Sequence, residues 1–442
     1  MREALEFRSK GGVGLPLLAL GGDLRSLWRP LFVVLSVLLF VPYTTGAMHW
    51  FFEQGYVPIQ PVFYMLGLGG LVVATGTIKR PEFSATALLV LGVVGARAGD
   101  VVFLQRFAYP WAPKTMMFFL TSVVFMVVVS AVIAGMMRRV SKLPMLAVAV
   151  ATVVVCAGVN LYEFAGFGDY SSVKGRAAGF LGDSNDSAIA ITLMLGVFLS
   201  CSRSFWWGAL MVGISGAGVL VTLSRSGMLV YVLMLVVWAL LNLRQNFGRL
   251  AIIAAVGVPL ASLGVGAMMA FSAKSAGVLG DENVEGRLAA LFGGDIEKMA
   301  SNERSRDLKE GLVGITKAPI AGLGTGAGTA LYMPHNQLVA VWIDLGLVGV
   351  LLYGGLLVVL GWQCLACGFK GVLVLIPVVG YVPFSQTLLE IPTYWLAVLA
   401  LTSITTVRVW SFSIFGKRGR VVRGNDGETG LVFEPAEAGG KR

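Results

Sequence analysis

The chain has 442 residues, of which 56% are hydrophobic and only 13% are charged, and its mean hydropathy is +0.80. A soluble domain carries about 25% charged residues, so this composition excludes an ordinary soluble enzyme and indicates a polytopic membrane protein. The apolar runs are continuous rather than alternating, which argues against a β-barrel, and they reach about 20 residues, the length of a helix that crosses a bilayer.

In chain order, the apolar runs predict an all-α fold with about twelve transmembrane helices. They cover residues 31–48, 57–78, 84–104, 116–136, 144–159, 187–200, 206–223, 227–241, 250–270, 336–360, 371–384 and 394–407. The excess of Lys and Arg falls in the short segments after every second run and in the C-terminal tail, as the positive-inside rule describes. Both ends are therefore predicted to be cytoplasmic, and the net charge of +10 is not read as a sign of nucleic-acid binding.

This topology divides the chain into five parts. They are a cytoplasmic N-terminal segment (1–30), nine transmembrane helices (31–270), a large outer loop with an amphipathic helix (271–334), three transmembrane helices (335–407) and a polar, glycine-rich cytoplasmic tail (408–442) that is predicted to be disordered. In the loop, residues 304–315 have a helical pattern with Asn302 as a candidate N-cap. Leu308, Leu312 and Ile315 share one face, which is expected to pack on the membrane domain or to lie at the interface.

The stretch that opens the tenth predicted helix holds the first candidate for chemistry. His335 is one of only two histidines, lies at the outer mouth of that helix, and is followed by Asn336, which could orient it. An imidazole can take a proton from a hydroxyl near neutral pH. The alternative is an interfacial histidine with no catalytic role.

Three arginines are candidates for binding an anion at the same surface. Arg225 lies in a short turn between two apolar runs, where a guanidinium is costly unless it is paired or faces a polar cavity. Anion binding, a local salt bridge and snorkelling all remain open for it. Arg304 and Arg306 begin the loop helix, whose N-terminus also favours phosphate. The alternative for these two is simple solvation of a charged helix.

Other polar groups near the outer surface have two readings each. Arg97 and Asp100 share a helix face and either pair with each other or line the same polar cavity. The glycine-rich turn 322–328 either lines that cavity with backbone amides or allows a tight return to the membrane. Before the sixth run, Asp183 and Asn185 either bind sugar hydroxyls or cap the helix.

Metal and redox chemistry have little support in the sequence. The nearest approach to a metal motif in the outer loop is Asp295-Ile296-Glu297. Cys364 and Cys367 have the spacing of a metal or redox pair but no second pair, so they are read as small buried residues. No cofactor is predicted.

Several of these strings resemble the signature of the O-antigen ligase and O-antigen polymerase superfamily. His335 is followed eleven positions later by Gly346, Arg304 precedes a Pro-x-x-Gly-x-Gly string that begins at Pro319, and Ser224-Arg225-Ser226-Gly227 is similar to the family's Ser-Arg-x-Gly turn. The string 182–185 is a degraded Asp-Pro-Asn motif, with Ser184 in place of the proline. The likeness runs from Gly179 to Gly349 in matching order.

The resemblance implies a GT-C-type architecture in the bacterial inner membrane, with an active site that faces the periplasm. It implies transfer of a glycan from undecaprenyl diphosphate to an acceptor sugar hydroxyl, without a metal ion. Ligation to lipid A core in lipopolysaccharide biosynthesis is the preferred activity; a polymerase of the same superfamily and a transporter of lipid-linked glycans are the alternatives. By this likeness His335 would be the base, and Arg225, Arg304, Arg306, Asn336 and Asn185 would bind substrate, with Arg304 preferred over Arg306 for the diphosphate because of its spacing to Pro319.

Overall fold

The computed structural model describes residues 22–57, 85–102, 142–172, 176–274, 302–367, 371–404, 419–423 and 429–433. The predicted helix at 116–136, nearly all of that at 57–78, the loop residues 275–301 with Asp295 and Glu297, and the ends of the chain lie outside these ranges. The description that follows concerns the described residues alone.

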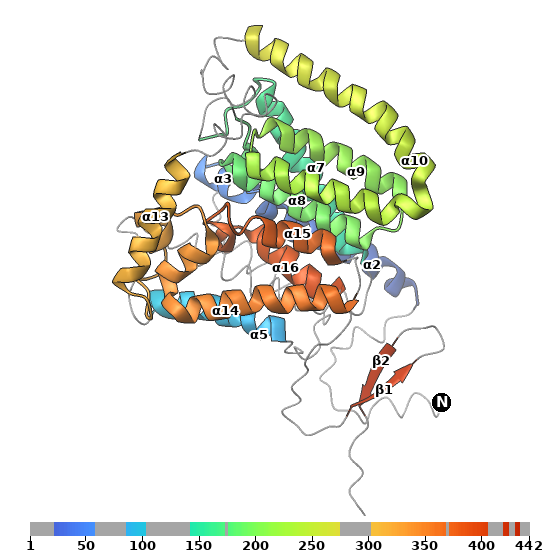
Figure 1. The fold of residues 1–442 in the computed structure, drawn as a ribbon. Helices are drawn as coiled ribbons and strands as arrows, with labels where there is room; N and C mark the ends of the chain where they lie inside the picture. Colours follow the sequence, from blue (N-terminus) through green and yellow to red (C-terminus); the bar gives the residue numbers. More distant parts are fainter. Residues whose placement is uncertain are drawn as a thin grey trace, which may run out of the picture.

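The centre of the molecule is a helix that is buried on all sides. In α8 (Ser184–Cys201), 89% of the residues are buried. It packs against α7 (Leu143–Phe164), α9 (Phe205–Val221) and the first half of α10 (Arg225–Lys274), with α15 (Val372–Gly380) and α16 (Pro392–Ile404) on the other side (Figure 1). A helix that is apolar all round is expected in such a central position.

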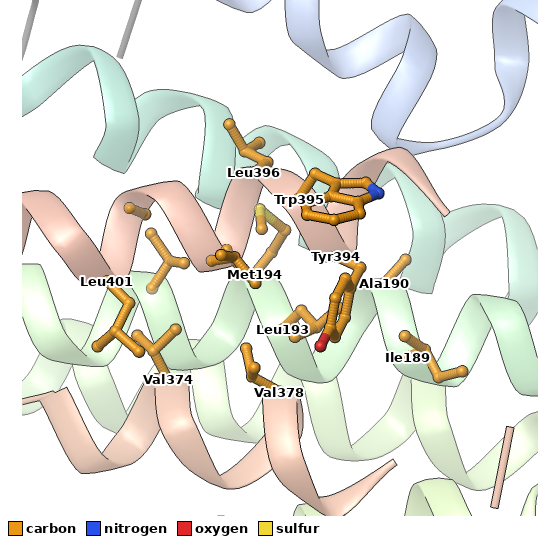
Figure 2. Close-up of a cluster of buried hydrophobic side chains, with 14 of the residues drawn as sticks. Ile189, Ala190, Leu193, Met194, Val374, Val378, Tyr394, Trp395, Leu396 and Leu401 are labelled. Atoms are coloured by element: carbon orange, nitrogen blue, oxygen red, sulfur yellow. The ribbon is translucent and has the colours of Figure 1, made fainter. Parts of the chain in front are cut away.

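Close side-chain packing joins the middle of α8 to the C-terminal helices. Figure 2 shows Leu193 and Met194 of α8 among Val374 and Val378 of α15 and Tyr394 of α16, all of them essentially inaccessible. Gly196 allows this approach, because a Cβ there would overlap the carbonyl group of Leu373. Small residues at helix contacts are typical of membrane proteins, in which van der Waals packing drives helix association.

A second group of helices forms one end and one side of the molecule. α14 (Gln337–Cys367) packs along α5 (Ala85–Val102), and α13 (Asn302–Lys317) stands across the first turns of α14 (Figure 1). α14 is not continuous, because Gly346 interrupts it with φ 64° and ψ −155°. The N-terminal ends of α8, α10 and α14 all lie on the side of the molecule where α13 stands (Figure 1).

By length and composition, four of the described helices can cross a membrane: α7, α8, the first part of α10 and α14. The number rises to five if α2 (Gly22–Thr44) and α3 (Ala47–Glu53), whose apolar parts meet at a bend of 64°, form one broken span. The predicted runs at 371–384 and 394–407 correspond to the shorter helices α15 and α16. The count of twelve and the GT-C architecture stay predictions.

Two sequence expectations differ from the structure. The runs 227–241 and 250–270, expected as separate helices, are two parts of α10 that meet at a bend at Asn246 (φ −131°, ψ 27°), because the segment between them is itself helical. The tail is not wholly irregular: β1 (Gly419–Arg423) pairs antiparallel with β2 (Thr429–Phe433), Val421 opposite Leu431. The fold is therefore helical apart from this hairpin, whose strands are rich in β-branched and apolar residues.

Candidate active site

The glycine-rich turn docks onto the interruption of α14. Gly322, Gly324 and Gly326 all have positive φ angles. The amide of Leu323 donates to the carbonyl of Ile343 (2.7 Å), and the amide of Leu347 donates to the carbonyl of Pro319 (3.1 Å). The turn therefore returns the chain tightly to α14. The eleven positions from His335 to Gly346 span the part of α14 between its N-terminus and the point where the turn docks.

Two buried carboxylates accept hydrogen bonds from this turn. Asp100 Oδ2 accepts hydrogen bonds from the amide and hydroxyl of Thr325 (2.6 and 3.1 Å), and Asp344 Oδ1 accepts one from the amide of Gly328 (2.7 Å). Arg97, also buried, lies 3.2 Å from Glu390 and 3.9 Å from Asp344. Arg97 and Asp100 thus belong to one polar cluster, and its described role is to support the glycine-rich turn and the segment before α16.

α13 packs on the N-terminal end of α14 through a face formed by glycines. Gly311 and Gly314 are buried, and a Cβ on Gly311 would stand 2.7 Å from Pro334, while one on Gly314 would stand 3.1 Å from Tyr332. Ile315 is buried beside them, whereas Leu312 is half exposed. Of the expected apolar face, Ile315 packs on α14 with the glycines, whereas Leu312 is exposed, as an interfacial position would be.

His335 is held in an unusual backbone conformation at this contact. Its φ is 46°, in the left-handed region, and Met333 two residues earlier has φ 42°. Non-glycine residues there are uncommon and cluster at functional sites. The amide of His335 donates to Gln386 Oε1 (2.9 Å), so a side chain from the segment before α16 fixes the position.

The imidazole of His335 meets a carboxylate of α13. His335 Nε2 lies 3.6 Å from Asp307 Oδ2, and the two side chains are 41% and 20% exposed. The ring is therefore accessible to a substrate and has an acidic group beside it that can orient it and stabilise its protonated form. Asp307 was missed by sequence reasoning, although an aspartate directly after Arg304-Ser305-Arg306 was a visible signal.

The arginines of α13 stand next to this pair. Arg306 is 70% exposed, and its Nε lies 3.8 Å from Asp307 and 3.7 Å from Glu310. Arg304 is the third residue of the same helix, and the structure describes its backbone but not its side chain. The preference for Arg304 over Arg306 as the diphosphate contact stays a prediction.

Asn336 has a structural task. Its Oδ1 accepts hydrogen bonds from the amides of Leu338 (3.0 Å) and Val339 (3.2 Å), which makes it the N-cap of α14. This geometry is the usual one for an asparagine at a helix start. A direct contact with substrate stays a prediction for this residue.

A second cluster surrounds the turn before α10. Asn185 Oδ1 accepts hydrogen bonds from the hydroxyl of Ser224 (2.9 Å) and from Arg176 Nη2 (3.2 Å), while Arg176 Nε donates to the carbonyl of Thr222 (3.2 Å). Arg225, half-buried, is the first residue of α10 and follows Ser224 directly. Arg176, which the sequence reasoning did not single out, therefore places a second guanidinium at the Ser-Arg-x-Gly turn.

The neighbouring Asp183 resolves one alternative. Its side chain accepts from the amides of Asn185 (2.6 Å) and Asp186 (3.4 Å), so it is the N-cap of α8. The loop that carries Arg176 is held in turn by Glu163, whose two carboxylate oxygens accept four backbone hydrogen bonds, from Tyr170, Ser171, Ala178 and Gly179.

The two clusters are joined through the segment before α16. Gln386 contacts His335, and the next residue, Thr387, donates to Asp186 Oδ1 (3.3 Å), which adjoins Asn185 in α8. The motifs around residues 185, 225 and 335, far apart in sequence, therefore meet at one end of the bundle. Within the described residues, no group of three His, Cys, Asp or Glu side chains is arranged as metal ligands.

The fold and this convergence define a helical membrane protein with an arginine- and histidine-bearing polar site at the mouth of a broken apolar helix. A family model described as O-Antigen ligase matches residues 210–354, a stretch that includes Arg225, α13, His335 and Gly346. This match covers less than half of the chain, and it supports membership of the O-antigen ligase and polymerase superfamily, as the resemblance predicted. The comparison with curated proteins gave no match.

Proposed function

We propose that this chain is a glycosyltransferase of the bacterial inner membrane that moves a glycan from undecaprenyl diphosphate to a sugar hydroxyl of lipid A core. The observation that carries the proposal is the accessible His335 beside Asp307, on the same end of the bundle as the Ser224-Arg225 turn. The matched family supports glycosyl transfer in general. The donor, the acceptor and the periplasmic orientation are parts of the proposal.

The reaction needs two things from the protein: a proton acceptor and a stabilised leaving group. The acceptor hydroxyl oxygen forms a bond to the anomeric carbon, its proton passes to His335 Nε2, and the bond from that carbon to the diphosphate oxygen breaks, which releases undecaprenyl diphosphate. General-base help of this kind contributes about 10²–10⁴-fold. Attack opposite the leaving group would invert the anomeric centre.

The guanidinium groups neutralise the departing diphosphate. Arg225 and Arg176 lie around the N-terminal ends of α8 and α10, and Arg304 and Arg306 lie in the first turns of α13. Arginine offers planar, paired donors that match phosphate oxygens. Loss of one such preorganised donor costs about 10²–10³-fold in kcat. Asp307 acts as a positioning residue, because it contacts the imidazole and not the substrate.

The test uses the purified full chain in detergent with undecaprenyl-diphosphate-linked glycan as donor. Lipid A core and a second lipid-linked glycan are offered separately as acceptors. His335→Ala and Arg225→Gln are compared with Lys309→Ala, an exposed cation on α13 outside the site. A chelator is added in a parallel reaction.

Product on lipid A core that is lost in His335→Ala and Arg225→Gln, retained in Lys309→Ala and unaffected by the chelator is the expected result. Product only on the lipid-linked acceptor would replace the ligase by a polymerase. Absence of product with both acceptors, in detergent where transport cannot be scored, would overturn the enzyme assignment in favour of transport. Normal turnover by His335→Ala would overturn the assignment of the base.

A further inference from the structure

A cavity lies at the end of the bundle opposite α13, far from His335. It has a volume of about 270 Å³ and is lined by the C-terminal end of α8, the first turn of α9, the end of the first part of α10 and the start of α15. Its lining combines apolar side chains with Ser202, Arg203, Ser204 and Asn242. This is the end that the distribution of basic residues predicts to face the cytoplasm.

The groups around the cavity include hydrogen-bond donors that could serve a ligand. Trp238 lines it and is only 5% exposed, yet no described residue accepts a hydrogen bond from its indole Nε1. That nitrogen lies over Gly208, where a Cβ would stand 3.3 Å from it, so the glycine keeps the approach to the donor open. Because Trp238 lines the cavity, its indole N–H can donate to a ligand bound there.

The cationic side chains are placed by the surrounding helices. Arg249 donates to Asn246 Oδ1 (2.9 Å) at the bend of α10, and its guanidinium lies 5.9 Å from the centre of the Phe205 ring. Phe205 in turn stacks on Trp238, with 5.4 Å between ring centres and 18° between planes. A guanidinium, a phenyl ring and an indole are therefore stacked beside the cavity.

No carboxylate in these elements competes for the cations. α9 and α10 contain no Asp or Glu, and Asp186, the acidic residue of α8, lies in the first turn of that helix, at the end away from Arg203. Cations with no carboxylate beside them favour an anion, and a phosphate group is an anion that arginine and an indole N–H can bind together.

The surroundings of the cavity are those of a membrane interface. Trp206 and Trp207 are 55% and 60% exposed next to it, as in an aromatic belt. Leu240 and Leu241 on α10 are also exposed, which provides an apolar surface for acyl chains. We propose that this cavity binds the phosphate of an anionic glycerophospholipid, with Arg203, Ser204 and the indole N–H of Trp238 as donors and Arg249 supplying further positive charge.

The test reconstitutes the full chain in phosphatidylcholine nanodiscs with and without phosphatidylglycerol. Native mass spectrometry after gentle release counts retained phosphatidylglycerol, and thermal unfolding measures the stabilisation it gives. Trp238→Phe removes the N–H and keeps the ring, with Trp207→Phe as the matched control at the same end. Arg203→Gln removes one charge, with Lys309→Gln as the matched control at the other end.

The expected result is that the wild type and both control variants retain phosphatidylglycerol, while Trp238→Phe and Arg203→Gln each bind it about tenfold more weakly, the effect of losing one hydrogen bond to a charged group. Equal retention by all variants, or equal retention of phosphatidylcholine, would overturn the proposal. Inorganic phosphate and glycerol phosphate are also added to the detergent-solubilised protein. If either raises the unfolding temperature as much as the lipid does, the site binds a free anion and the lipid proposal is overturned.

Discussion

The interruption of α14 at Gly346 offers the sharpest single test of how the fold builds the site. The residue has φ 64° and ψ −155°, a conformation open in practice only to glycine. A Cβ there would overlap the carbonyl of Ile320 and stand 2.6 Å from the amide nitrogen of Gly322. Gly346→Ala must therefore displace the 319–324 turn from α14.

The cost of this displacement has two parts. The strained backbone costs about 1–3 kcal/mol. Moving the turn weakens the hydrogen bonds from Leu347 to Pro319 and from Leu323 to Ile343, 3.1 and 2.7 Å long, each worth about 0.5–1.5 kcal/mol. Together these give a loss of about 2–6 kcal/mol, which reaches the upper end for a single substitution.

The assay compares Gly346→Ala with Gly354→Ala, two turns further along the same helix. A Cβ on Gly354 meets nothing within 4 Å, so alanine there is expected to be neutral or to stabilise the helix by up to about 1 kcal/mol. Thermal unfolding in detergent and glycan transfer are measured for both. Because α13 rests on the same turn, a shift of about 1 Å between Asp307 and His335 also lowers transfer by up to about 10²-fold. Equal stability and activity of the two variants would refute the reasoning.

Two further substitutions test contacts that join separate parts of the chain. Asp307→Asn is expected to lower kcat by up to about fivefold with little change in KM, because a partly exposed pair is worth about 0.2–1 kcal/mol. Asp307→Glu should recover most of the rate, and an unchanged, salt-independent kcat in Asp307→Asn would remove Asp307 from the mechanism. Glu163→Gln is expected to destabilise the protein by about 2–3 kcal/mol, because its amide group would face backbone N–H donors that now bind carboxylate oxygens. The control is Glu310→Gln, which changes an exposed glutamate. Equal unfolding temperatures of the two variants would contradict the role of Glu163.

Much of the site could be predicted from local sequence. Apolar runs of bilayer length do not depend on partners, so the helical membrane class follows from composition alone. His335, Arg225 and Gly346 were identified because a titratable group, an arginine in a short turn and a glycine at fixed spacing are each informative without any knowledge of packing. The order of these motifs along the chain also led to the family.

What the sequence by itself determined was therefore the class of protein and the chemical groups in its motifs. Only the tertiary structure decided which groups meet: Asp307 with His335, Gln386 behind the same residue, and Arg176 with Asn185. It also decided that Asp183 and Asn336 cap helices and that Arg97 pairs with Glu390, 293 positions away. The physical reason is that periodicity and capping act over a few residues, whereas ion pairs and hydrogen bonds between helices depend on how close glycines such as Gly311 and Gly346 let the backbones approach.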